Sequence, residues 1–236
     1  MIPTYSSDKT IKKGIVVNHL EQLNEYDFTM PHRHDYFEFF YFTSGGGTHS
    51  IDFKEFEIHD NSVHIVAPGQ VHQMNRALDS EGYVVLFELS ALNPPSVIES
   101  FLFEHICMSA EELSPTFRFD ERLMQPLNDR IKHIYESYKR SALLDQLRLV
   151  NEMQLFCLSC MEEAGELDSP VDSDYLKFRR FLNSNFKVYK KVKDYAEKMN
   201  LTERALNDLV KHNSGKSVSE VIYRQIVMEA KRLLRT

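Results

Sequence analysis

The chain has 236 residues, 42% of them apolar, and a net charge of −7 at pH 7. This length is sufficient for two domains with separate hydrophobic cores. Apolar runs stay shorter than the roughly 18 residues of a membrane helix, and the first residues lack the charged-then-apolar order of a signal peptide. Three cysteines are an odd number, which argues against a disulfide framework and favours a reducing compartment. We therefore expect a cytoplasmic protein without a membrane partner.

Short strands are predicted over the first ninety or so residues. Runs rich in Phe, Tyr, Val and Ile alternate with turn formers such as Gly45 to Gly47 and Pro68-Gly69. The predicted strands are 14–20, 36–44, 48–53, 55–60, 62–69 and 82–89. Strands this short, closely spaced and consecutive indicate a β-barrel or sandwich, which we place in residues 1–95.

Helical spacing replaces the strand pattern in residues 96–163. Between Glu121 and Met161, apolar residues recur at intervals of three, four and seven, which predicts two antiparallel helices. Their apolar stripes could pack on the barrel, on each other or on a second subunit, so this range is a candidate dimerisation or packing region. The acidic stretch 164–173, with Gly and Pro, is predicted to be an interdomain linker.

The charge of the remaining segment has the opposite sign. Residues 174–236 contain 15 Lys/Arg and 7 Asp/Glu, whereas residues 1–173 contain 13 and 28. A basic block at one end is typical of a module that neutralises phosphates. A solvated helical surface would give the same composition, so charge alone leaves both interpretations open.

Residues 192–217 predict a helix-turn-helix. Asn200-Leu201 forms the turn and Thr202 is a good N-cap for a second helix, whose Leu206, Leu209 and Val210 point inward. Such a helix can enter the major groove of DNA, where Arg204 suits guanine, Asn207 suits adenine and Lys211 suits phosphate. The predicted DNA-binding residues are Thr202, Glu203, Arg204, Asn207, Asp208 and Lys211.

Residues 205–234 carry a family resemblance. The sequence Ser214-Gly215-Lys216-Ser217, followed by a long helix ending in Glu229-Ala230-Lys231-Arg232-Leu233-Leu234, resembles the first half of the DNA-binding domain of AraC/XylS-family transcription regulators. The resemblance implies an effector-responsive regulator that is not an enzyme and has an N-terminal cupin-like domain. It also implies that the regulator binds a small-molecule effector and double-stranded DNA and assembles as a homodimer. The family's DNA-binding domain has two helix-turn-helix units, whereas residues 174–236 match only the first. We therefore expect a partial domain that binds its operator more weakly than a form with both units.

A second resemblance lies near the front of the chain. His32-x-His34, Glu38 and, after Pro68-Gly69, His72 have the spacing with which metal-binding cupins collect three histidines and a glutamate. On alternating strand positions His32, His34 and Glu38 share one face. Cupin-like regulators often keep such residues without metal, where they hydrogen-bond an effector or stabilise the barrel. We therefore assign no cofactor and keep a divalent metal as an alternative.

Two candidate sets follow from this second resemblance. The effector-binding candidates are His32, His34, Tyr36, Glu38 and His72, and the metal candidates are His32, His34, Glu38 and His72. A complete metal set would instead favour a cupin enzyme of the dioxygenase or isomerase type, with the basic helical segment as an accessory. Further histidines either line the barrel or are ordinary structural residues, namely His19, His49, His59 and His64. The expected fold class is α+β, with a cupin-like barrel, a helical pair and an all-α helix-turn-helix module.

Overall fold

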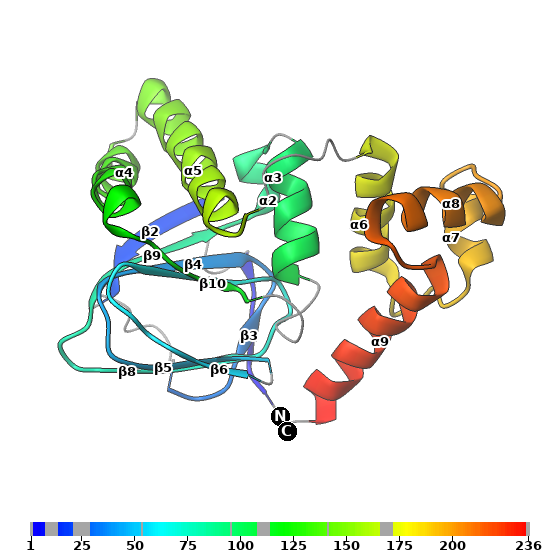
Figure 1. Ribbon diagram of the computed structural model, residues 1–236, viewed down its shortest axis with the longest axis horizontal. Coiled ribbons are helices and arrows are strands. Elements are labelled where there is room, and N and C mark those ends of the chain that lie inside the picture. Colours follow the sequence, from blue (N-terminus) through cyan, green and yellow to red (C-terminus); the bar gives the residue numbers. More distant parts are fainter. Residues whose placement is uncertain are drawn as a thin grey trace. The chain divides into compact units, whose positions relative to one another are not determined.

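The computed structural model describes residues 2–7, 14–20, 29–52, 54–94, 96–107, 114–140, 142–165 and 172–234. The chain divides into two units, Met1–Asp168 and Ser169–Thr236. Strands and helices make up the first unit, and helices make up the second (Figure 1). Residues 166–171 of the predicted linker lie outside the described residues.

Two antiparallel sheets form the body of the first unit, and both orders contain non-consecutive neighbours. The larger sheet has the order β10-β7-β4-β9-β2 and the smaller has the order β6-β5-β8. The larger sheet comprises β2 (Ile15–His19), β4 (Phe37–Ser44), β7 (Ser62–Val66), β9 (Glu81–Phe87) and β10 (Thr116–Arg118). The smaller comprises β5 (Gly47–Ile51), β6 (Lys54–Glu57) and β8 (His72–Arg76).

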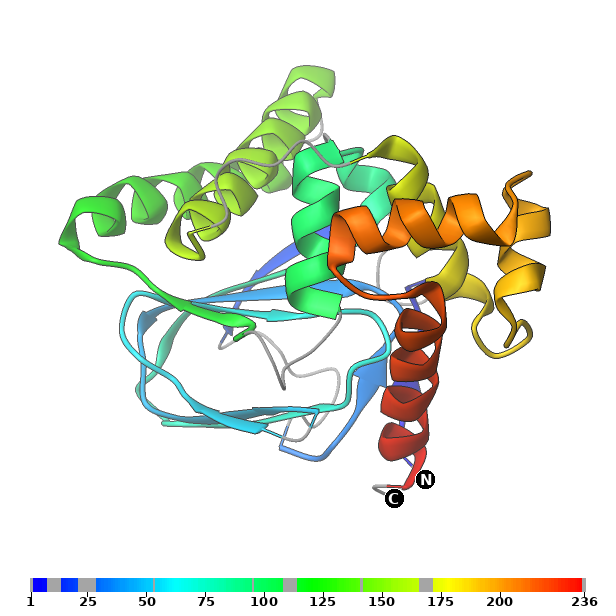
Figure 2. The same ribbon diagram turned by 45° about the vertical axis from the view of Figure 1, so that its right-hand side comes forward.

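A short additional pair lies beside the smaller sheet. Strand β1 (Thr4–Tyr5) pairs in parallel with β3 (Arg33–His34), and His32 forms an isolated antiparallel bridge with His72 of β8. This bridge connects the His32–His34 segment to the smaller sheet. The expected α+β class is confirmed, but in the described residues the strands form two facing sheets and not a closed barrel (Figure 2).

Helices cover the side of the larger sheet that faces away from the smaller one (Figures 1 and 2). They are α2 (Leu89–Leu92), α3 (Ser96–Phe101), a π-helix (Leu102–Cys107), α4 (Glu121–Lys139) and α5 (Leu143–Glu163). The Asp120 carboxylate caps α4 by accepting hydrogen bonds from the backbone N–H groups of Arg122 and Leu123. Helix α5 buries Met153, Phe156 and other apolar side chains of one face against the sheet.

Strand periodicity separates two apolar clusters in this unit. Along β4, Phe37, Phe39 and Tyr41 belong to the cluster beneath the helices, whereas Phe40 and Phe42 belong to the cluster between the sheets. Successive side chains of a strand point to opposite faces, so one strand supplies both clusters. The inner face of the larger sheet is therefore available to position residues between the two sheets.

The second unit consists of α6 (Ser173–Asn185), α7 (Val192–Lys198), α8 (Glu203–Ser214) and α9 (Val218–Leu234). Asn200, with φ of 55°, forms the turn between α7 and α8. Thr202 caps α8 and Gly215, with φ of 69°, ends it. Helix α7 buries Tyr195 and Ala196, and α8 buries Leu206 and Val210. In the described part of the chain, no helix is long and apolar enough to span a bilayer.

Candidate ligand site between the sheets

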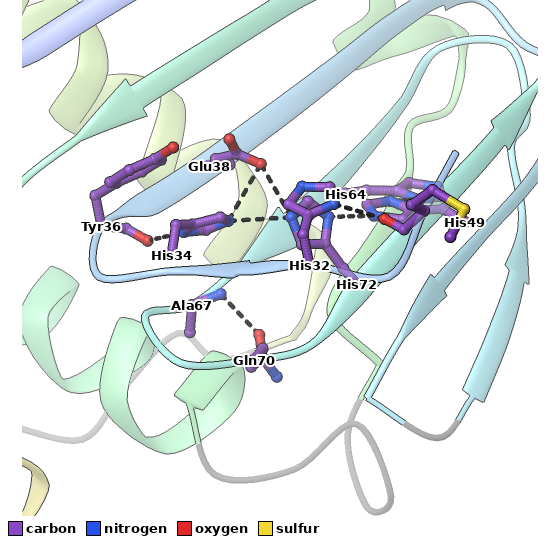
Figure 3. A network of polar contacts seen from close by, with 10 residues as sticks. His32, His34, Tyr36, Glu38, His49, His64, Ala67, Gln70 and His72 are labelled. Atoms are coloured by element: carbon purple, nitrogen blue, oxygen red, sulfur yellow. Dashed lines mark hydrogen bonds and ion pairs between the residues drawn. The ribbon is translucent and has the colours of Figure 1, made fainter. Parts of the chain in front are cut away.

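A cluster of polar side chains lies between the two sheets (Figure 3). Its members come from β3, β4, β5, β7 and β8 and from the residues next to them, and none is more than 2% exposed. They are His32, His34, Tyr36, Glu38, His49, His64 and His72. Burying this many polar groups costs free energy unless they interact with one another or with a ligand, so their mutual geometry decides what the site can bind.

Three of these side chains form a small triangle of potential ligand atoms. His34 Nε2 lies 3.2 Å from His72 Nε2 and 3.3 Å from Glu38 Oε2, and His72 Nε2 lies 3.5 Å from Glu38 Oε2. The three residues form a group that could hold a metal ion. Two imidazole nitrogens and one carboxylate oxygen are thus directed at a common point.

The hydrogen bond on the other side of the His34 ring fixes its tautomer. His34 Nδ1 lies 2.7 Å from the carbonyl oxygen of Tyr36. Because a carbonyl only accepts hydrogen bonds, Nδ1 must donate its N–H, and in the neutral ring Nε2 then carries the lone pair. The Tyr36 ring stacks on the His34 ring, with centroids 4.3 Å apart, and holds it in this orientation.

Burial keeps the deeper histidines neutral. Desolvation lowers the pKa of His72 and His49 well below the usual value of 6.5, and neighbouring histidines lower both further. Burial, with a smaller effect of His59, lowers the pKa of His64 to about 3. Neutral imidazoles are the form that binds metal ions, so the electrostatics of the cluster agree with the geometry of the triangle.

The donor atoms fit a divalent transition metal. Ligand atoms bound at about 2.0–2.1 Å to one tetrahedral ion are about 3.3 Å apart, and neighbouring atoms around an octahedral ion are about 3 Å apart. The observed separations of 3.2 to 3.5 Å match this range closely. Imidazole and carboxylate together suit Zn, Fe, Mn, Ni or Cu. His34, Glu38 and His72 would hold such an ion.

The predicted effector-binding residues all lie in this cluster. Of the four predicted metal residues, three form the triangle and one lies beside it. His32 is not part of the triangle. Its Nδ1 lies 2.9 Å from the carbonyl oxygen of Met30, and its ring packs on the His72 ring with centroids 4.1 Å apart. His49 and His64, which sequence reasoning left undecided between lining the barrel and a structural role, belong to the cluster. The sequence signal that could have identified them is their position within two predicted strands, where alternation directs every second side chain to the inner face.

The predicted DNA-binding residues lie on α8 and at its start. Arg204, whose side chain is 93% exposed, has its Nε 3.9 Å from Asp208 Oδ2, and Glu203 and Lys211 are also exposed. Thr202 Oγ1 accepts a hydrogen bond from the Ala205 N–H as the helix cap. The half-buried Asn207 accepts one through Oδ1 from the backbone N–H of Val218, which begins α9. Two of the six residues therefore also stabilise the helices.

The facing sheets, the helices on one side and the buried histidine cluster define a ligand-binding domain of the cupin-like kind. The model of the AraC-like ligand binding domain matches residues 19–153, which is more than half of the chain. The chain therefore belongs to this family. No curated protein sequence matches it.

Solved structures that match this chain include those of two regulators and a cupin. The AraC-like transcriptional activator CuxR shares 13% identity with a TM-score of 0.41, over 82% of this chain and 66% of CuxR. Apo ToxT from Vibrio cholerae shares 12% identity with a TM-score of 0.46, over 94% and 83%. A cupin protein from Bacteroides fragilis shares 25% identity with a TM-score of 0.23, over 30% and 60%. The chain thus spans less than two thirds of CuxR and of the cupin.

Proposed function

We propose that the chain is a ligand-responsive transcription regulator of the cytoplasm and not an enzyme. A small ligand bound between the sheets would change the binding of the helical unit to double-stranded DNA. The observation that carries this proposal is the presence, in one chain, of an AraC-like ligand binding domain and of α7 and α8, two helices joined by a short turn, with exposed basic residues on α8. A ligand can shift DNA binding only if it binds the two states with different affinity.

The DNA contact would be made by the exposed face of α8. The buried faces of α7 and α8 hold the two helices together, and Arg204 and Lys211 lie on the opposite side of α8. Arg204 would read a guanine edge and Lys211 would contact a phosphate. Glu203, Asp208, the cap Thr202 and the remaining Asn207 N–H groups would complete the contact.

Selection of DNA sequences from a random pool tests this contact, followed by titration of the selected duplex at several salt concentrations. We expect Arg204→Ala to weaken binding about 10- to 100-fold and to relax the base preference at one position. Lys211→Ala should weaken binding to all sequences and reduce the salt slope by about one. Lys132→Ala, an exposed lysine of α4, is the matched control. A selection that enriches no sequence would refute the proposal.

The effector would bind within the buried cluster. His32, His34, Tyr36, Glu38 and His72 offer hydrogen-bonding and ionic groups there. A thermal-shift screen of metabolites, sugars and divalent metals should find a stabilising ligand, because binding to the native state raises Tm by mass action. The same ligand should fail to stabilise His34→Ala. A ligand that stabilises both forms equally does not use this cluster.

A homodimer is the proposed assembly, through α5. Leu144, Leu147, Leu155 and Leu158 lie at intervals that place them on one side of this helix, and all are exposed. Burying them against a second copy would remove this apolar surface from water. Sedimentation of the chain and of Leu147→Asp tests this assignment. We expect the substitution to produce monomers, and a wild-type monomer at high concentration would contradict it.

A second candidate function is a metal-dependent cupin enzyme, and the donor triangle of His34, Glu38 and His72 favours it. A bound divalent metal would supply Lewis-acid chemistry or oxygen activation. The chain's own residues would orient a substrate beside Tyr36 and exclude water. Stabilisation by metal alone, turnover of a small substrate and absence of DNA selection would together favour the enzyme.

A further inference from the structure

A row of imidazole contacts leads away from the donor triangle. His72, which faces the triangle through Nε2, has its Nδ1 3.1 Å from His49 Nε2. His49 Nδ1 in turn lies 3.2 Å from His64 Nδ1, and these two rings are 3° from parallel. The three histidines come from β8, β5 and β7, so the row crosses from the smaller sheet to the larger one (Figure 3). We refer to His72, His49 and His64 as the histidine row.

The walls of the row leave the ring nitrogens to interact with each other. The Phe40 ring packs edge-on against His49 with centroids 5.3 Å apart, and the Phe42 ring does so against His64 at 5.2 Å. Both phenylalanines belong to the inner face of β4. Apolar rings offer the imidazoles no conventional hydrogen-bond acceptor or donor. The nitrogen-to-nitrogen contacts are thus the main polar interactions along the row.

Hydrogen bonds along the row must all run in one direction. A neutral imidazole has one N–H and one lone pair, so each contact needs a donor on one ring and an acceptor on the next. When His72 directs the Nε2 lone pair into the triangle, its Nδ1–H donates to His49 Nε2. His49 Nδ1–H then donates to His64 Nδ1. In the opposite state every bond is reversed, and His72 directs an N–H into the triangle.

The far end of the row accepts either direction. His64 Nε2 is buried without a hydrogen-bond partner among the described residues, so neither direction of the row gains or loses a hydrogen bond at this end. What decides the direction is therefore the group in the triangle. The Glu38 carboxylate belongs to that triangle and favours a cation over an anion.

We propose that His49 and His64 are positioning residues for His72: they hold its ring in place and accept its Nδ1–H while its Nε2 lone pair faces a divalent transition-metal ion held by His34, Glu38 and His72. This inference rests on the ion site that the second candidate function uses, and it extends that site by a second layer of residues. Outer hydrogen bonds to a ligating histidine fix its ring orientation and raise its basicity. Without His49 the Nδ1–H of a metal-bound His72 would lose the acceptor that His49 Nε2 supplies at 3.1 Å.

Cobalt titration of the full chain tests the positioning role, because bound Co²⁺ has a visible absorption band that reports ligand geometry. His49→Phe keeps a ring in place but offers no acceptor for His72 Nδ1–H, and we expect its Kd for Co²⁺ to rise about 10- to 100-fold. His49→Gln should bind within a few-fold of wild type, since its amide oxygen accepts that hydrogen bond. His64→Phe should have a smaller effect than His49→Phe, because it acts one contact further away.

Two controls separate positioning from general damage. His59→Phe changes a histidine whose side chain is 42% exposed and should leave Kd unchanged. Metal-free thermal unfolding of every variant should show a cooperative transition. Nitrogen NMR of the His72 ring in the wild-type chain adds a readout that a structural role would not move: Zn²⁺ should convert it to the tautomer protonated at Nδ1.

The outcomes distinguish the role of the histidine row from the existence of the ion site. Equal Co²⁺ affinity of His49→Phe and wild type, with an unchanged absorption band, would show that the histidine row does not position His72, while the ion site stands. Absence of any Co²⁺ binding by the wild-type chain would overturn the ion site and the row together. DNA selection is independent of both results, so a failure here leaves the regulatory proposal to its own test.

Discussion

The two faces of the larger sheet bury very different side chains. The face toward the helices is apolar, with Phe37, Phe39, Val63 and Ile65 packed against α5 and its neighbours. The face toward the smaller sheet carries Glu38 and His64 among apolar residues, although both are as deeply buried. Apolar burial stabilises a fold, whereas buried polar groups cost stability unless they are paired. The comparison indicates that the outer face holds the domain together, and it supports the proposal that a ligand binds at the inner face.

The largest expected effect lies on the helix-facing side. Phe39 is buried, packing edge-on against Phe87 at 4.8 Å and near Phe156 at 6.1 Å. Phe39→Ala should lower the free energy of unfolding by about 3–5 kcal/mol, because it removes apolar contacts and leaves a cavity. Urea denaturation measures this loss. The exposed Val188→Ala should change it by less than about 0.5 kcal/mol, and equal losses would contradict the contrast between buried and exposed positions.

A metal ion should stabilise through the inner face alone. With Zn²⁺ at about 100 times its Kd, we expect the free energy of unfolding to rise by about 2.7 kcal/mol. Glu38→Gln keeps the size of the side chain but removes the charge from the triangle, so most of this gain should disappear. Thermal unfolding with and without Zn²⁺ measures it. An undiminished gain in Glu38→Gln would place the ion elsewhere.

Lowering the pH should reduce the free energy of unfolding through the buried histidine of the inner face. The pKa of His64 is lowered from 6.5 to about 3, so as pH falls the unfolded chain binds this proton first and stability is lost below pH 6.5. Between pH 6.5 and 4.5 this histidine should account for a loss of about 2 kcal/mol. His64→Phe should therefore lose less stability over that interval. His133→Phe, at an exposed histidine, should keep the wild-type slope, and equal slopes for both variants would refute the assignment.

The smallest effect concerns a polar contact on the helix-facing side. The Tyr41 hydroxyl donates a hydrogen bond of 2.9 Å to Asn128 Oδ1 on α4, and burial raises the pKa of Tyr41 well above its usual value. Tyr41→Phe should cost about 1 kcal/mol, since Asn128 loses its donor while the ring packing remains. Chemical denaturation of the variant measures this cost. A loss as large as that of Phe39→Ala would show that the hydroxyl is more than a local contact.

Local sequence patterns were sufficient to predict which strand residues share a face and where α8 begins and ends. Alternation predicted that His32, His34 and Glu38 share one face, and the cupin spacing proposed His32, His34, Glu38 and His72 as metal residues, of which the last three form the triangle. The N-cap Thr202 and the terminal Gly215 bounded α8 as expected. These features depend on residues close in sequence, because side-chain direction and helix ends follow local backbone geometry.

Contacts between strands that are far apart in the chain could not be predicted from the sequence. The spacing of His32 matched the cupin pattern, yet its ring packs beside His72 and not in the triangle. His49 and His64 are 15 residues apart in the chain and become neighbours only because β5 and β7 belong to sheets that face each other. The leucines of α5 gave a helical stripe, but folding decided that Leu144 and Leu147 stay exposed while Met153 and Phe156 are buried.

Periodicity, helix caps and motif spacing lie along the chain, so they were enough to predict the fold class, the family resemblance and the residue types of the candidate site. Which histidines share that site, which ring nitrogens lie in contact and how far the site extends depend on the packing of the two sheets. The physical reason is that sheet order and facing set distances of a few ångströms between residues that are far apart in sequence, and the chemistry of a buried site depends on those distances.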